Sequence, residues 1–147
     1  MKAVGIAVVA LPFLVACSST QDRVVDEMAD ALVDGRYDEA WTLADSLTED
    51  RANCSVENLA DVAVAWVMLN NEAVKTDSIE AGEVAMNSFR TIYSAMVERD
   101  SSEAVEQIEK IRRKNPQLNL TAIDSMYTAT LQQVETLRRV SARLPLK

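Results

Sequence analysis

The chain has 147 residues, 15 of them basic, 23 acidic and none histidine, which gives a formal net charge of −8 at pH 7. Such an acidic chain is poorly suited to bind the phosphates of nucleic acids, and the absence of histidine removes the commonest general base and metal ligand. With only three glycines and three prolines, the composition argues against an all-β chain rich in tight turns and favours helices.

The first 17 residues carry one charge and then an uncharged apolar run. Lys2 precedes the run Ala3–Ala16, which is followed by Cys17. The run is shorter than the about 20 residues that a membrane span needs, and Pro12 interrupts its helical geometry. The composition is therefore typical of a signal peptide, with an uncleaved N-terminal anchor or a plain secretory signal as alternatives.

The sequence Leu14-Val15-Ala16-Cys17 resembles the lipobox of bacterial lipoproteins, in which a signal peptidase cuts before the cysteine and the cysteine is diacylated. The resemblance implies a signal peptide over residues 1–16 and a membrane anchor through lipid on Cys17. The lipidated cysteine and a short tether would occupy residues 17–21, and a single helical domain residues 22–147. Ser18 stands where inner-membrane lipoproteins of enterobacteria carry aspartate, so the resemblance favours the Gram-negative outer membrane.

Apolar residues recur at helical spacing in six segments. The fold is therefore predicted to be all-α, with about six antiparallel helices. We expect Gly35 to end the first helix, Asp77 and Asp100 to cap the fourth and fifth, Asn115-Pro116 to end the fifth, and Pro145 to bound the sixth. The predicted helices cover about 22–34, 37–47, 55–69, 78–99, 101–114 and 121 onward, with a polar loop over 70–77.

The third predicted helix is apolar around most of its circumference, so we expect it to be central. Gly82 lies on the apolar stripe of the fourth helix, which indicates a close helix crossing. Trp41, Trp66 and Tyr37 could line a ligand pocket, but their helical spacing favours packing in the core.

The turn Gly35-Arg36-Tyr37-Asp38-Glu39-Ala40 resembles that of a tetratricopeptide repeat, in which the glycine permits the turn, the tyrosine fills the crook of the hairpin and the alanine lets the helices approach. A shift of 64 residues also superimposes two halves of the chain, placing Glu39-Ala40 on Glu103-Ala104 and Val25 on Phe89. This spacing is slightly less than two periods of 34 residues. The resemblance implies a tetratricopeptide-like α-solenoid, and an irregular helical bundle is the alternative.

Charge is distributed unevenly along the chain. Residues 18–100 contain 18 acidic and 6 basic side chains, whereas residues 101–147 contain 5 and 8. The bases gather where the fifth and sixth helices are predicted to end, as expected for cations at helix C-termini. The alternative is a basic surface that docks on an anionic partner. These bases are Arg112, Arg113, Lys114, Arg138, Arg139, Arg143 and Lys147.

Cys54 would have no partner for an internal disulfide if Cys17 is lipidated. We expect it to be a small buried or semi-buried apolar residue. The alternatives are a reactive thiol, since the positive end of a predicted helix start would favour a thiolate, and an intermolecular bridge.

No catalytic motif stands out in the sequence. It has no glycine-rich phosphate loop and no Ser-x-x-Lys or Gly-x-Ser-x-Gly motif, and its acidic clusters lack the spacing of a calcium loop. We therefore expect no enzyme, cofactor or metal site, and a membrane-anchored module that binds a protein partner in the cell envelope. The alternatives are an envelope ligand-binding lipoprotein with an inter-helix cavity and a self-associating structural protein.

Overall fold

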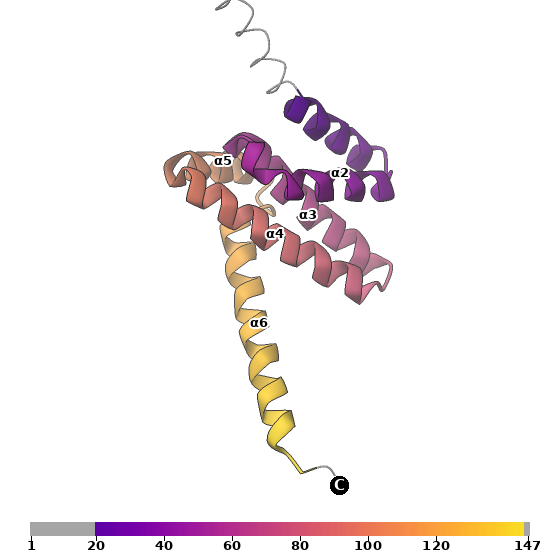
Figure 1. Ribbon diagram of the computed structural model, residues 1–147, viewed down its shortest axis with the longest axis vertical. Coiled ribbons are helices and arrows are strands. Elements are labelled where there is room, and N and C mark those ends of the chain that lie inside the picture. The colour runs from indigo at the N-terminus through magenta and orange to yellow at the C-terminus, as the bar shows by residue number, and fades with distance from the viewer. Residues whose placement is uncertain (1–19, 146–147) are drawn as a thin grey trace, which may run out of the picture.

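The computed structural model describes residues 20–145, which form six α-helices and one short 3-10 turn, without a strand in this range (Figure 1). The all-α prediction with six helices is confirmed. The first helix covers residues 20–33 and so includes Thr20 and Gln21, which the prediction placed in the tether. The other elements are α2 (Tyr37–Glu49), η1 (Arg51–Asn53), α3 (Val56–Lys75), α4 (Ile79–Arg99), α5 (Ser101–Lys114) and α6 (Leu120–Arg143).

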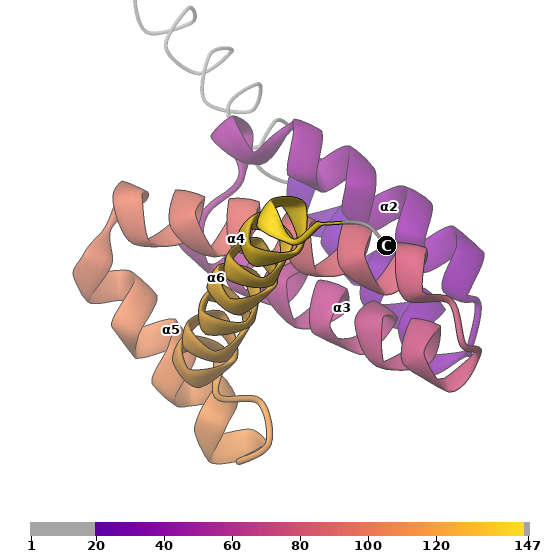
Figure 2. The same ribbon diagram turned by 90° about the horizontal axis from the view of Figure 1, so that it is seen from below.

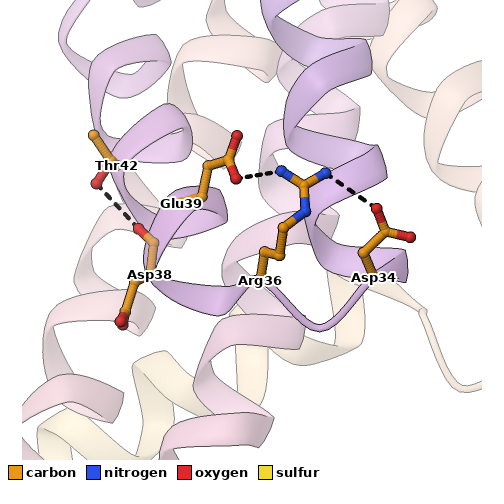
Figure 3. Close-up of polar contacts among 5 residues, drawn as sticks. All are labelled: Asp34, Arg36, Asp38, Glu39 and Thr42. Carbon is orange, nitrogen blue, oxygen red and sulfur yellow. Dashed lines mark hydrogen bonds and ion pairs between the residues drawn. The ribbon is translucent and has the colours of Figure 1, made fainter.

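The turn that follows the first helix is at Gly35, as predicted. Gly35 has a φ of +74°, and the backbone N–H of Arg36 donates to the carbonyl of Ala31 at 2.8 Å. This left-handed turn satisfies carbonyls that the helix end leaves free. At the surface of the turn, the guanidinium of Arg36 bonds to Asp34 at 3.1 Å and also to Glu39 (Figure 3).

Tyr37 does not fill the crook of this hairpin, so that part of the prediction is wrong. Its side chain is 36% exposed, whereas Ala31 and Ala40 on either side of the turn are fully buried. Small side chains at these two positions allow the two helices to approach closely. The predicted role of Ala40 is consistent with its burial.

α3 is the central helix, as its apolar circumference predicts. It contributes eleven buried residues, including the fully buried Trp66, and packs most extensively against α4 and also against α2 and α5. Buried Asn58 joins it to the first helix, because its Nδ2 donates to the Oδ1 of Asp22 at 2.9 Å. The core of the molecule therefore surrounds α3.

The predicted polar loop over 70–77 is wrong, because α3 continues to Lys75. Ala73 is buried and extends the apolar stripe of the helix by another turn. The connection to α4 is a tight turn at Asp77, whose φ is 55°. The residue at the N-cap of α4 is Ser78 and not the predicted Asp77, and its side chain makes no capping bond.

Gly82 marks the predicted close approach of α4 to α3. A Cβ at this position would lie 3.0 Å from the Oδ1 of Asn70 and 3.9 Å from the Cβ of Ala73. A side chain at this position would therefore require the amide of Asn70 to shift by a few tenths of an ångström.

The ends of α5 agree with the prediction and the start of α6 does not. Asp100 caps α5, since its Oδ1 accepts from the N–H of Glu103 at 3.0 Å, and the helix ends at Lys114. α6 begins at Leu120 and is capped by Asn119, whose Oδ1 accepts from the N–H of Ala122 at 3.2 Å. The capping residue thus precedes the predicted Thr121.

Two pairs of helices begin at the 64-residue spacing that the sequence comparison predicts. α5 begins 64 residues after α2, and α6 begins 64 residues after α3. Ala40 and Ala104, which this shift superimposes, are both buried. In the first half α3 is covered by α4, whereas α6 in the equivalent position contributes only Leu120 to the buried residues.

α6 extends away from the body formed by the other helices (Figure 1). Viewed from below, α6 points toward the reader in front of α4 and α3 (Figure 2). Its N-terminal part contacts α4 and α5. Its C-terminal half is exposed along its whole length.

Candidate functional site

A groove lies between α6 and the corner where α3 meets α4. Its volume is about 1000 Å³, at the upper end of the range for small-molecule sites. We call it the groove. Its apolar lining comprises Val67, Met68, Val74, Ile79, Met86, Leu118, Ile123, Met126, Tyr127, Leu131 and Val134.

Two tyrosines fix α6 against α4 and so set one wall of the groove. The hydroxyl of Tyr127 donates to the Oδ1 of Asn87 at 3.1 Å, and the hydroxyl of Tyr93 donates to the Oγ1 of Thr121 at 3.2 Å. Tyr93 also stacks on Phe89 of the core, with ring centroids 5.9 Å apart. Partial burial, followed by the charge of Glu83, raises the pKa of Tyr127, so its hydroxyl remains a donor at neutral pH.

Large apolar side chains stand exposed on both sides of the groove. On α6, Met126 is 68% and Leu137 65% exposed, and Val140 lies on the same helix face. On the corner, Val74 is 66% and Ile79 84% exposed. Met126, Leu137 and Ile79 each have apolar neighbours at helical spacing, a pattern typical of a covered helix face, but nothing among residues 20–145 covers them.

The two sides of the groove carry opposite charge. Residues 72–83 contain one base, Lys75, and four acids that we call the acidic corner: Glu72, Asp77, Glu80 and Glu83. The last turns of α6 contain Glu135 and three bases that we call the basic end: Arg138, Arg139 and Arg143. The Nε of Arg139 pairs with Glu135 at 3.1 Å, whereas Arg138 and Arg143 form no ion pair with any residue in 20–145.

The predicted basic C-terminal surface is divided between two helices. Arg112 on α5 pairs with Glu109 at 2.7 Å, and Lys110 lies 3.9 Å from Glu57 on α3. These ion pairs offset part of the positive charge of α5. Arg113 and Lys114 on α5 form no ion pair within residues 20–145 either, so unpaired positive charge lies at the ends of both helices.

The tryptophans belong to the core, as their spacing predicts. Trp66 is fully buried, and its Nε1 donates to the Oγ1 of Thr48 at 2.9 Å. The ring of Trp41 meets that of Trp66 edge to face, with centroids 5.0 Å apart and an angle of 88°. Neither tryptophan lines the groove, and Tyr37 does not line it either.

Cys54 is buried, with 1% of its surface exposed, at the end of η1 just before α3. Its Sγ lies 3.7 Å from the carbonyl oxygen of Asp50. Burial, followed by the charge of Asp50, raises the pKa of the thiol. This environment supports a small buried apolar residue and opposes both a reactive thiolate and an accessible bridging cysteine.

Cys17 and the rest of the lipobox-like sequence lie outside residues 20–145. Within that range no helix is both long enough and apolar enough to cross a bilayer. The described residues also contain no cluster of three or more His, Cys, Asp or Glu side chains suited to a metal ion.

Comparison of the chain with protein-family models, with curated proteins and with solved structures finds no match. The groove is therefore interpreted from its own residues.

Sequence reasoning missed the groove because it treated each apolar stripe as covered. Periodicity shows which side of a helix is apolar, but not whether another helix lies against it. The apolar stripe of α6 is unusually wide, running from Ile123 and Tyr127 to Met126 and Leu137. A stripe of this width indicates that two neighbouring elements pack against α6, and residues 20–145 supply only one of them.

Proposed function

We propose that this chain is a lipid-anchored module of the bacterial cell envelope that binds a protein partner in the groove. The proposal rests on one observation, namely an open apolar groove whose two sides carry opposite charge. Exposed apolar patches of this kind are uncommon on monomeric proteins and are typical of interaction sites. Unpaired charges at the rim add orientation and selectivity.

The lipobox-like sequence supports the anchoring part of the proposal. Two or more acyl chains at Cys17 would hold the domain stably at a membrane. We expect wild-type protein to incorporate labelled fatty acid and to fractionate with the outer membrane, and Cys17→Ser to remain soluble or unprocessed. A wild-type protein without fatty acid would contradict the anchor, and protease treatment of intact cells would show which face carries the domain.

Crosslinking in intact cells, followed by mass spectrometry, tests the groove. The groove variant carries Met126→Glu in the lining of the groove and Leu137→Glu on the adjoining face of α6. The matched control carries Val33→Glu and Val105→Glu at exposed positions away from both. We expect one stoichiometric protein to crosslink to the wild type and to the control, but not to the groove variant.

Two other results would contradict the proposal. Crosslinks that persist in the groove variant would place the interaction on another surface. Recovery of only lipid or glycan with the wild-type protein would favour a ligand-binding lipoprotein instead.

A further inference from the structure

The repeat of helix starts suggests what kind of element the groove lacks. α3 and α6 occupy equivalent positions 64 residues apart, and α3 is covered along its length by an antiparallel neighbour, α4. The corresponding face of α6 carries the exposed Met126 and Leu137 and has no such neighbour within residues 20–145. An antiparallel helix is therefore the element that would complete the second half in the same way as the first.

We propose that this helix is α6 of a second copy of the chain, and that two copies pair about a two-fold axis with their α6 helices antiparallel in the two grooves. The inference rests on the proposed function, because it names the occupant of the same groove. In this dimer, each α6 forms one wall of its own groove and also fills the groove of the second copy. Such self-complementarity is the defining property of a two-fold interface.

Charge complementarity selects a second copy as the occupant. The acidic corner carries four acids against one base, and the basic end carries three bases against one acid. Within one chain, Arg138 lines the groove together with Asp77 and Glu83, and α6 then leads its C-terminus away from the body (Figures 1 and 2). The basic end of a second α6 can reach the acidic corner and supply the charge that it lacks.

The same charges determine the direction of the second helix. α6 has 24 residues and is about 36 Å long, and only its N-terminal part contacts the body. An antiparallel α6 from the second copy would bring its C-terminus toward the body, and hence its basic end toward the acidic corner. A parallel arrangement would hold the two basic ends together, where they repel each other.

The apolar residues fit this arrangement. Met126, Leu137 and Val140 lie on one face of α6, and Val74 and Ile79 stand exposed on the corner. A second α6 in the groove would cover the α6 face with its own identical face and would cover the corner with its C-terminal turns. Each copy would thereby bury the residues that it leaves exposed alone.

The test uses two charge-reversed versions of the full chain with different C-terminal epitope tags. Variant A carries Arg138→Glu and Arg143→Glu, and variant B carries Glu80→Lys and Glu83→Lys. All four positions are exposed, and the ion pair between Arg139 and Glu135 is retained. Differently tagged copies are expressed together and solubilised in mild detergent, and one tag is then captured.

Capture of one tagged wild-type chain is expected to co-purify the other. When both chains are variant A, or both are variant B, the co-purified amount is expected to fall by about tenfold or more, because each pair brings like charges together. A with B is expected to restore it, because both contacts of the mixed pair then join opposite charges. Restored co-purification also shows that variants A and B are folded. The control variant, Arg113→Glu with Lys114→Glu on α5, is expected to co-purify as much as the wild type.

Three results would overturn the second copy as occupant. They are a failure to capture one tagged wild-type chain with the other, equal capture in all combinations, and a failure to capture variant A with variant B. The proposed function fails by a different result, namely the absence of crosslinks that depend on Met126 and Leu137. A groove that crosslinks to another protein while tagged copies do not associate would retain the proposed function and reject the dimer.

Discussion

The indole Nε1 of Trp66 donates a 2.9 Å hydrogen bond to the Oγ1 of Thr48, and this bond joins the central helix α3 to the end of α2. The hydroxyl of Thr48 in turn donates to the carbonyl of Ala44 at 2.7 Å. Both residues are buried, so no water competes for the indole N–H. The hydroxyl of Thr48 thus provides the hydrogen-bond acceptor for the indole N–H of the largest side chain in the core.

Thr48→Val should therefore destabilise the protein although it preserves side-chain shape. The buried N–H of Trp66 would lose its acceptor, at a cost of about 1–3 kcal/mol. Urea unfolding followed by circular dichroism measures the change. Thr48→Ser, which keeps the hydroxyl, is the matched control and should be destabilised less; equal losses would show that the hydrogen bond is not the cause.

Gly35 and Asp77 should respond to substitution in opposite directions. Both have positive φ, and both N–H groups close the preceding helix, bonding to Leu32 and Val74 respectively at 3.2 Å. A side chain in this conformation costs about 1 kcal/mol. Asp77→Gly should raise the free energy of unfolding by up to that amount, and Gly35→Ala should lower it; a loss of stability in Asp77→Gly would contradict the argument.

Asp100 and Ser78 provide a matched pair at the starts of α5 and α4. Asp100 accepts a capping bond from the N–H of Glu103, whereas Ser78 makes no capping bond through its side chain. Asp100→Ala should lower the free energy of unfolding by about 1 kcal/mol. Ser78→Ala should change it little, and a comparable loss there would show that the cap is not what the first substitution removes.

Cys54 should be inert in the folded protein and should make stability depend on alkaline pH. Burial raises the pKa of its thiol above the unfolded value, so the unfolded chain releases this proton first. Stability is therefore expected to fall as the pH rises through the unfolded pKa of about 8.5. Cys54→Ala should remove this component of the pH dependence.

A thiol reagent tests the same environment directly. In a Cys17→Ser background, it should modify Cys54 only after urea unfolding. Rapid modification of the native protein would show that the thiol is accessible.

Local chemistry made much of the fold predictable. Gly35 and Asp100 act through bonds within a few residues of themselves, and both were correctly assigned. The error over residues 70–77 has a local cause as well. The polar side chains of Asn70, Asn71 and Glu72 predict a loop, although these residues form a partly exposed turn of a helix whose next residue, Ala73, is buried.

The groove could not be predicted in this way, because it depends on which helix lacks a neighbour. Ile79 and Leu137 have apolar neighbours at helical spacing, as buried residues do, yet both are exposed. The 64-residue shift gives partial information about the missing neighbour. It aligned α6 with α3, and the coverage of α3 by α4 shows what α6 would need.

The early start of the first helix restricts how the molecule would meet a membrane. Because Thr20 is already helical, no more than two residues of the sequence lie between the described helix and Cys17, a reach of at most about 10 Å. Two copies acylated in one leaflet would have to present both Thr20 residues to the same surface, so their two-fold axis would stand along the membrane normal. The antiparallel α6 helices, perpendicular to that axis, would then lie flat along the bilayer, and diffusion in two dimensions would raise their encounter frequency far above that of the same chains free in solution.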